Sequence, residues 1–354
     1  MRFHVPPLLA AVAAALVLGC AAAVPAAAAG EESELLVMRD ERITESSGLV
    51  ASVQHPGVYW THNDSGDEPR VFAVGADGKT KAVVTLQGVS PRDWEAVSLG
   101  KDEAGKPALF VADVGDNFKG KWPEVWIYRF AEPAELKDAT VKPVKYRVTY
   151  DDGPRDAEAM LVDPRTNKIY LASKENDAGL YEQPAALSPT GLNVFRRIAK
   201  APGTVTDGAF SPDGTRFVLR GYFTARMFSA PGVEVGDVPV PIQRQGESVA
   251  FSTDGRALLF GSEGPDSPVR RVVLDGANRP DSVAAADNQQ AGGPQAAQPG
   301  AAPADGGGDP DGLAGQDDSN EAYGPGFLAV LGLVVLVYVV LKFRGRGSGS
   351  SAGS

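Results

Sequence analysis

The amino-acid sequence predicts an all-β fold, a five-bladed β-propeller, from three observations. A unit of four β-like runs recurs between residues 30 and 276. Each unit opens with an acidic or hydroxyl-bearing residue beside an apolar run. The units follow one another at about 40–50 residues, the usual spacing of propeller blades. A six-bladed ring is the alternative if the long step from Glu95 to Glu158 contains a degenerate blade. A β-sandwich is the plainer alternative, but it does not predict the recurring opening motif.

The first two strands of each unit are the most regular part of the repeat. The runs at the opening motif predict the innermost strands, at residues 46–52, 94–100, 157–163, 205–214 and 246–255. The next runs predict second strands at residues 58–64, 108–117, 168–175, 216–222 and 257–263. In the last two units a Ser-x-Asp-Gly sequence separates these strands, which is a tight hairpin signal.

The outer strands are expected to close the ring. Third strands are predicted at residues 70–76, 124–130, 179–184, 225–230 and 269–274, and fourth strands at 81–86, 144–150, 193–199 and 238–243. The fifth unit has no fourth strand of its own, whereas the run "ELLVMR" at residues 34–39 has no partner in the first unit. Placing this run at the outside of the last unit closes the ring, which is how propellers avoid exposed sheet edges.

The N-terminal segment, residues 1–29, has the pattern of a secretory signal peptide. A short basic start precedes an apolar stretch from Leu8 to Leu18, and small residues up to Ala29 provide a cleavage site. The only cysteine of the chain, Cys20, lies in this segment. Disulfides and thiolate chemistry are therefore not expected in the mature chain. Lipidation of Cys20 in the sequence "LVLGC" is the alternative fate of this residue.

The C-terminal part predicts a membrane anchor. Residues 277–326 are almost wholly small and polar and cannot form a core, so a disordered tether is expected. Residues 327–343 are apolar apart from Lys342 and, as a helix of roughly 25 Å, are just long enough to cross a bilayer. Basic residues in the tail, residues 344–354, mark the cytoplasmic side. The expected topology is a single-pass cell-membrane protein whose body lies outside the cell.

The composition excludes several classes of partner and site. The 354-residue chain has a formal charge of −11, which argues against nucleic acid as a partner because the phosphates would be repelled. The mature chain has two histidines, His55 and His62, so a three-histidine zinc centre cannot form. Within residues 30–276, neither a Gly-x-Ser-x-Gly elbow nor a GxxxxGK[ST] phosphate loop occurs.

One residue at the opening of each inner strand belongs to a column that should converge on the axis of the ring. The members of this column are Ser47, Glu95, Glu158, Thr206 and Glu247. Its three glutamates cannot share a small space without a neutralising cation, because like charges raise each other's pKa. Carboxylate and hydroxyl oxygens are the ligands that calcium prefers. The sequence therefore predicts a calcium ion on the axis, held by the column.

Arginines provide the alternative way to neutralise the column. Arg92, Arg155 and Arg244 each stand three residues before a column glutamate. Each could pair with that glutamate or with the glutamate of a neighbouring blade. The Arg-x-x-Glu motif would then order the junctions between blades. The same arginines are also candidate ligand-binding residues.

The second strand of each blade ends on the face where the first strand begins, so its last residues should surround the mouth of the channel. The candidate ligand-binding residues there are His62, Asn63, Asp116, Asn117, Lys174, Glu175, Arg220, Tyr222 and Glu263. Asp113 and Asp64 occupy similar positions and are candidate catalytic residues. Asp, Asn and Gly residues in such loops can also serve only to hold tight turns.

The column resembles that of a known family. A Ser/Glu/Glu/Ser/Glu set, one residue per blade of a five-bladed propeller, is similar to the soluble calcium-activated nucleotidases (apyrases), with Thr206 in place of a serine. The resemblance covers the inner two strands of the five units and leaves out the outer strands and loops. The phrases "SSGL", "HNDSGD", "DWEAV" and "VADVGDN" also resemble secreted bacterial propellers of the phytase-like or esterase-like group. The nucleotidase resemblance implies calcium on the axis.

Two functional classes follow from these observations. The favoured interpretation is a membrane-anchored extracellular module that binds a ligand or protein on its channel face, with calcium on the axis. The alternative is a calcium-dependent phosphoanhydride or phosphoester hydrolase. In that enzyme the ion would bind phosphate oxygens, and Asp113 or Asp64 would orient a water molecule. The predicted fold does not decide between them because propellers serve both purposes.

Overall fold

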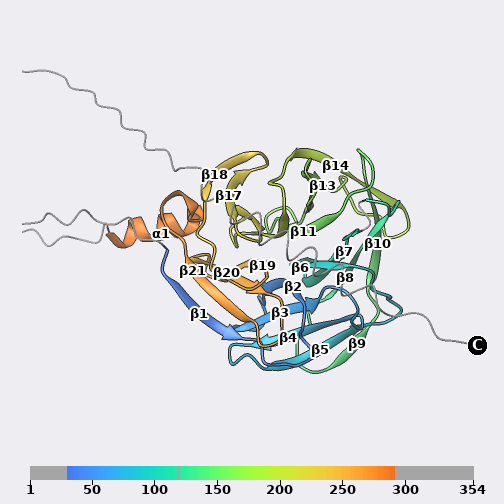
Figure 1. Ribbon diagram of the computed structural model, residues 1–354, viewed down its shortest axis with the longest axis horizontal. Coiled ribbons are helices and arrows are strands. Elements are labelled where there is room, and N and C mark those ends of the chain that lie inside the picture. Colours follow the sequence, from blue (N-terminus) through green and yellow to red (C-terminus); the bar gives the residue numbers. More distant parts are fainter. Residues whose placement is uncertain (1–29, 118–119, 292–354) are drawn as a thin grey trace, which may run out of the picture. The chain divides into compact units, whose positions relative to one another are not determined.

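The computed structural model describes residues 30–117 and 120–291 of the chain (Figure 1). In these residues the fold is almost entirely β. Twenty-one strands are accompanied by one short 3₁₀ helix, η1 (Gly276–Asn278), and one α-helix, α1 (Asp281–Ala291). Strands that follow one another along the chain pair antiparallel, mostly in groups of four.

The first group begins near the N-terminus. Its strands are β2 (Ser46–Ala51), β3 (Val58–Asn63), β4 (Arg70–Gly75) and β5 (Thr80–Leu86). A short strand that the sequence did not predict, β9 (Ala139–Val141), pairs parallel with β5 and adds a fifth member to this sheet.

The next two groups form one eight-stranded sheet. The second group contains β6 (Trp94–Lys101), β7 (Pro107–Asp113), β8 (Val125–Ala131) and β10 (Val144–Tyr150). The third contains β11 (Ala157–Val162), β12 (Ile169–Ser173), β13 (Gly179–Glu182) and β14 (Leu192–Lys200). Parallel pairing of the outer strands β10 and β14 joins the two groups.

The last two groups complete the arrangement. The fourth contains β15 (Val205–Phe210), β16 (Phe217–Gly221), β17 (Ala225–Ala230) and β18 (Val233–Asp237). The fifth contains β19 (Gly246–Phe251), β20 (Ala257–Ser262), β21 (Pro268–Val273) and, from the other end of the chain, β1 (Glu32–Val37). The antiparallel pairing of β1 with β21 confirms that the N-terminal run is the outer strand of the last sheet.

The first strands of the groups share one centre. β2 packs beside β6, β6 beside β11, β11 beside β15, and β15 beside β19, while β19 packs beside β2. These contacts form a closed cycle, and Figure 1 shows β2, β6, β11 and β19 meeting near the middle of the fold. The chain therefore has a propeller-like all-β fold.

Burial on both faces accounts for the apolar inner strands. All six residues of β11 and all six of β19 are buried, because each inner strand has neighbours packed on either side. Clusters of apolar side chains fill the spaces between the groups, and one contains Trp60 and Trp94. The indole Nε1 of the buried Trp60 donates to Glu132 Oε1 at 2.9 Å, so this polar group is satisfied inside the core.

The outer strand of the fourth group differs from its prediction. The sequence predicted it at residues 238–243, but β18 ends at Asp237. Pro239 and Pro241 lack the backbone N–H that a strand ladder requires, and this explains why the paired strand lies just before them.

Helix α1 corrects the predicted boundary of the tether. Residues 277–326 were expected to be disordered, but their first part contains η1 and α1. The Asp287 carboxylate pairs with Arg256 at 2.8 Å and with Arg279 at 3.0 Å, and Val283 is buried. These tertiary contacts stabilise a helix whose composition alone does not predict one.

The predicted signal peptide, most of the tether, the predicted membrane span at residues 327–343 and the tail all lie outside the described residues. Within the described part of the chain, no helix has both the length and the apolar character needed to cross a bilayer.

Leu36 provides a test of the closing strand. It lies on β1 and packs in a core cluster with Leu49 and Val269, so Leu36→Ala should lower the free energy of unfolding by about 2–5 kcal/mol. Leu192→Ala is the matched control, because Leu192 is 47% exposed and its truncation should cost about 0.5 kcal/mol or less. Thermal and urea denaturation measure both. Equal stability of the two variants would contradict a closing role for β1.

Candidate metal centre

Each inner strand has an irregularity at the same place, its second residue. The pairing register with the neighbouring strand shifts across this residue in all five groups. The residues concerned are Ser47, Glu95, Glu158, Thr206 and Glu247, which are the members of the predicted column. A bulge re-aims a side chain out of the alternating pattern of a strand. The column therefore has a common structural origin.

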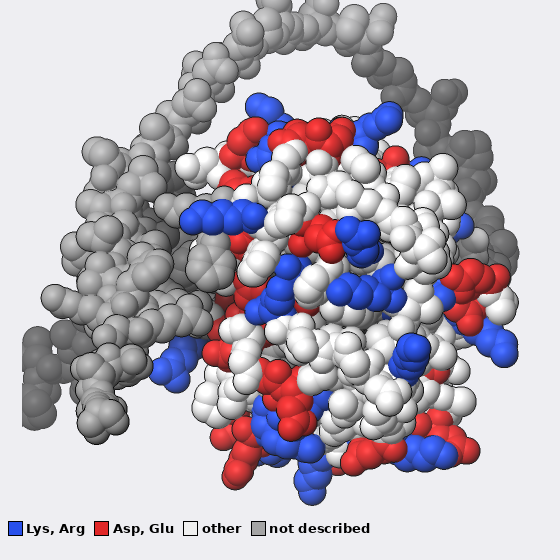
Figure 2. Space-filling model, turned by 90° about the vertical axis from the view of Figure 1, so that its right-hand side faces the viewer, with Lys and Arg blue, Asp and Glu red and all other residues white. Residues whose placement is uncertain are grey.

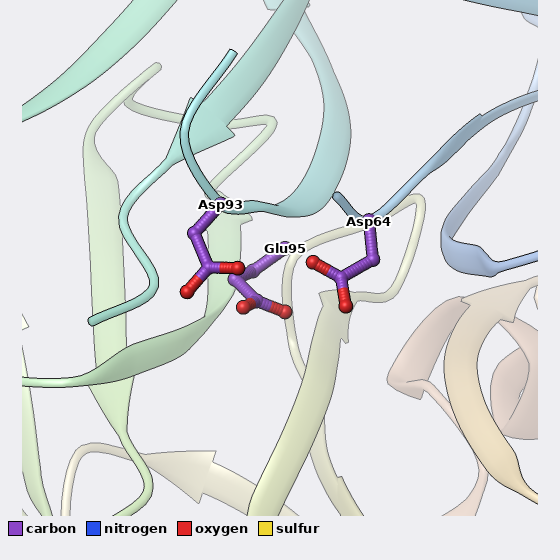
Figure 3. A group of neighbouring side chains, drawn as sticks. All are labelled: Asp64, Asp93 and Glu95. Atoms are coloured by element: carbon purple, nitrogen blue, oxygen red, sulfur yellow. The ribbon is translucent and has the colours of Figure 1, made fainter. Parts of the chain in front are cut away.

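The structure brings one member of the column, Glu95, close to two aspartates, Asp64 and Asp93. Asp64 directly follows β3, Asp93 directly precedes β6, and Glu95 lies at the bulge of β6. One carboxylate oxygen from each lies within 4.8 Å of the others. Figure 3 shows the three carboxyl groups pointing toward one another. Oxygen atoms at this spacing could hold a divalent cation.

Backbone contacts fix the positions of these residues. The backbone N–H of Asp93 donates to Asp113 Oδ1 at 3.0 Å, and Asn117 Nδ2 donates to Asp93 Oδ2 at 2.8 Å. The Trp94 N–H donates to the Asp64 carbonyl at 3.2 Å, which ties the end of β3 to the beginning of β6. The three carboxylates are thus placed at the junction of the first two groups.

Glu95 is the least compensated member of this trio. Its exposed fraction is 3%. No hydrogen bond or ion pair in the described part of the chain reaches its carboxylate. Burial first, and then the negative charges of Glu158 and Asp64, hold the pKa of Glu95 well above its ordinary value. Burial and the nearby Asp93 likewise raise the pKa of Asp64 to about 9.

Glu158, by contrast, has a cationic partner. Lys174, which directly follows β12, forms an ion pair with Glu158 Oε1. Burial raises the pKa of Glu158 to about 8 although Lys174 opposes the shift. Burial and Glu263 raise the pKa of Glu247 to about 7. The acidic centre, defined here as Asp64, Asp93, Glu95, Glu158 and Glu247, therefore contains one half with an ammonium group and one without.

One hydroxyl member of the column links two inner strands. The Thr206 hydroxyl donates to the backbone carbonyl of Glu247 at 2.7 Å, joining β15 to β19. Of the three glutamates predicted to bind calcium, the geometry places Glu95 with Asp64 and Asp93. The predicted calcium-binding role of Ser47 and Thr206 stays a prediction.

The alternative in which the arginines pair with the column glutamates is wrong for Arg155 and Arg92, which have other partners. Arg155 pairs with Asp152 at 2.7 Å, not with Glu158. The guanidinium of Arg92 lies over the rings of Trp126 and Trp122, 3.5 and 4.5 Å from their centroids. Arg244 is exposed. Aromatic faces and surface aspartates thus attract these side chains away from the column.

Several predicted rim residues have structural contacts instead of facing the mouth. Arg220 is fully buried, and its guanidinium donates to the carbonyls of Ser248 and Gly261, the latter at 2.8 Å. His62 is also fully buried, and burial lowers its pKa to about 4. Asn63 accepts hydrogen bonds from two backbone N–H groups of the preceding loop and has an exposed fraction of 5%.

Asp113, the last residue of β7, and Asp116, in the loop after it, are also buried. Asp113 accepts from the N–H groups of Arg92 and Asp93, so it orients the loop before β6 and is not part of the carboxylate trio. Asp116 accepts from the Trp122 N–H at 2.5 Å. Of the two catalytic candidates, only Asp64 belongs to the acidic trio.

The remaining rim candidates lie close to the acidic centre. The negative charge of Glu247 and burial raise the pKa of Tyr222, with burial the larger cause. Gln245 donates to both Glu247 and Glu263. Glu175 accepts from the Asp156 N–H at 2.7 Å beside the opening of β11. These side chains are only partly buried, so they could contact a ligand above the centre.

Asp93 belongs to the site although it was not among the predicted residues. It could have been found in "RDWE", where an aspartate stands two residues before the column glutamate. Asp207 was not predicted either, and its buried carboxylate accepts from the Val249 N–H at 2.8 Å and links β15 to β19.

Gly115 leaves room for two of the carboxylates. A Cβ atom at this position would collide with Glu95 Oε1 and would lie 2.8 Å from Asp93 Cγ. The Gly115 N–H also donates to the Asp93 carbonyl at 3.3 Å. The glycine of "DVGDN" is therefore required by close approach of the loop to the acidic trio.

The charges on one face of the surface are mixed. On the face seen in Figure 2, lysine and arginine side chains are interspersed with aspartate and glutamate.

Comparisons with known proteins give no family. No family model matches the chain, and no curated protein is similar to it. A solved structure titled "Crystal structure of glucose dehydrogenase" is similar with a TM-score of 0.43 and 10% identity. The match covers 69% of this chain and 100% of that chain. The grouping with nucleotidases or phytase-like propellers stays a prediction.

Gly115→Ala tests the close packing around the trio. The added methyl group must displace Glu95 or Asp93, and overpacking of this kind costs about 1–3 kcal/mol. Gly203→Ala is the control, because the nearest atom to its new Cβ is 4.0 Å away and its backbone is not left-handed. Chemical denaturation of both variants should show a loss only for Gly115→Ala; an equal loss would contradict this role of Gly115.

Stability in the presence of a chelator should fall between pH 7 and pH 9. The folded-state pKa values of Glu158 and Asp64 are raised to about 8 and about 9, far above unfolded values of about 4. The folded state therefore binds more protons, and its stability decreases as pH rises through the folded pKa values. The lowered pKa of His62, about 4, has an opposite effect only below about pH 6.5.

The melting temperature of the full-length chain measures this dependence. Asp64→Asn should reduce the loss between pH 7 and pH 9, whereas the control Asp77→Asn, at an exposed aspartate, should leave it unchanged. A melting temperature that rises over this range in the unmutated chain would contradict the buried-carboxylate account.

Proposed function

We propose that the chain is a five-bladed β-propeller that holds a calcium ion at its acidic centre and binds an extracellular ligand or protein on the same face. The observation that carries the proposal is the trio of the half-buried Asp64 and the buried Asp93 and Glu95, which offer carboxylate oxygens within 4.8 Å of one another. The buried Glu95 carboxylate points into this group without a hydrogen-bonding or ionic partner among the described residues.

The blade count is supported by the strand pairing. Each of the five inner strands begins a group of four hydrogen-bonded strands, and the last group is completed by β1. The cyclic packing of the inner strands has five members. A sixth blade would need a further group between Glu95 and Glu158, where the described residues form β7, β8 and β10 of the second group and the short β9.

A cation is the simplest compensation for the trio. Burial of unpaired carboxylates is costly, because water no longer solvates their charge. A divalent ion stabilises the charged forms and removes the mutual repulsion. Oxygen-only ligands favour calcium or magnesium over zinc or copper. Calcium accepts the irregular geometry of three side chains and added waters more readily than magnesium does.

A ligand would approach from the side on which the strand-end loops meet. Lys174 has a side chain that is 27% exposed, and Asn117 is exposed beside Asp93. Tyr222, Glu175 and Glu263 are partly exposed. Loops on one propeller face commonly carry binding sites. The predicted signal peptide and apolar C-terminal segment support a location outside the cell, anchored in the membrane.

Hydrolysis of a phosphate bond is the alternative function. It is favoured by the position of Asp64 in the trio, where its carboxylate could orient a water molecule at the ion. The alternative needs a substrate phosphate, and Lys174 is the cation placed nearest for it.

Calcium titration of the full-length chain tests the proposal. A hundredfold excess over the dissociation constant should stabilise the folded state by about 2.7 kcal/mol, which corresponds to a rise in melting temperature of roughly 5–10 °C for a domain of this size. Glu95→Gln should abolish the rise, because it removes a charged ligand. Glu135→Gln, at a surface ion pair, is the matched control and should retain it.

A phosphate-release assay at the same calcium concentrations separates the two functions. Release of phosphate from nucleotides that depends on calcium and is lost in Asp64→Asn would favour the hydrolase. An unmutated chain whose melting temperature is indifferent to both calcium and chelator would overturn the metal centre.

A further inference from the structure

Lys174 is held firmly inside the acidic centre. Its backbone N–H donates to the Asp156 carbonyl at 2.9 Å, and its carbonyl accepts from the Thr204 N–H at 3.4 Å. The backbone is thereby fixed between the openings of β11 and β15. The side chain reaches Glu158, whose own side chain is 4% exposed. Among the described ion pairs, this is the one that involves a glutamate of the column.

The two halves of the centre are supplied by different groups of strands. The trio Asp64, Asp93 and Glu95 comes from the first two groups, and no ion pair among the described residues reaches it, although the charge of Lys174 acts on Glu95 at longer range. Glu158 comes from β11 of the third group and Glu247 from β19 of the fifth.

Lys174 compensates the second half. Burial alone would lower the pKa of Lys174, but Glu158 and Glu95 outweigh burial and raise it, so the ammonium group keeps its charge. The same ammonium lowers the pKa values of Glu158 and Glu247 against the effect of burial. Its charge thus acts on both glutamates of this half and also on Glu95, but its ion pair is with Glu158.

We infer that the Lys174 ammonium group replaces a second divalent cation, so that the acidic centre binds one ion, at the trio, and not two. This inference rests on the proposed function, because it assumes that the trio binds calcium. The physical reason is competition for the same oxygens. An ammonium group in contact with Glu158 Oε1 occupies the space that an ion would need, and its positive charge repels a cation there. Lys174 therefore determines the stoichiometry of the centre.

The test counts calcium ions per full-length chain by isothermal titration and by elemental analysis after gel filtration. The unmutated chain should bind one ion. Lys174→Met removes the ammonium and keeps an unbranched side chain, and it should bind two. Lys168→Met is the matched control, because Lys168 forms its ion pair with Glu182 at 2.6 Å on the same group of strands but away from the centre. It should bind one ion.

The outcomes separate the inference from the proposed function. No calcium in the unmutated chain overturns the proposed function and this inference with it. One ion in the unmutated chain and one in Lys174→Met overturns the inference alone. Two ions in the unmutated chain also overturn it, because the lysine would then not exclude a second ion.

A second pair of substitutions keeps the test decisive if Lys174→Met does not fold. Lys174→Gln also removes the positive charge, but its amide can still donate a hydrogen bond to Glu158. It should bind two ions, and one ion in the folded Lys174→Gln variant would overturn the inference. Lys174→Arg keeps a positive charge beside Glu158 and should bind one ion. Two ions in Lys174→Arg would also overturn the inference.

Discussion

Burial of several carboxylates at the opening of the inner strands is the constraint on which the rest of the structure depends. The inner strands pack in a closed cycle, and this packing directs the bulged residues of different strands toward one region. Glu95, Glu158 and Glu247 are each at most 4% exposed. Such charges must be offset by protons, by an ammonium group or by a metal ion. Lys174 supplies an ion pair for Glu158, whereas no ion pair among the described residues reaches the trio around Glu95, on which Lys174 acts only at longer range.

The surrounding loops are built to hold this charge in place. Gly115 permits the close approach of Glu95 and Asp93. Asn117 and Asp113 fix Asp93 through its side chain and its backbone. Buried polar groups of this kind destabilise a fold unless their partners are provided. A chain that retains an uncompensated trio at such a cost fits a binding site better than a purely structural junction, because strongly shifted pKa values concentrate at functional sites.

The fold could be predicted from the sequence where local pattern and burial agree. The inner strands are buried on both faces, so they appear as short apolar runs beside a polar opening residue, and these runs coincide with β2, β6, β11, β15 and β19. The pairing of the N-terminal run with β21 could be deduced because an unpaired edge had to be covered. The position of β18 was misjudged because the prolines after it were given too little weight. Helix α1 could not be foreseen, since contacts such as Arg256 with Asp287 stabilise it.

From the sequence alone, the residue that recurs at the opening of each inner strand could be identified. It follows that acidic groups gather at one end of the inner strands. The tertiary structure alone decided which charges meet. Arg155 lies three residues before Glu158 and was expected to pair with it, but it pairs with Asp152. Glu158 pairs instead with Lys174, which directly follows β12. Asp93 enters the site although it is not in the column. The reason is physical: spacing along the chain fixes the strand on which a charge lies, whereas ion pairing depends on distances between strands, which only the packed ring defines.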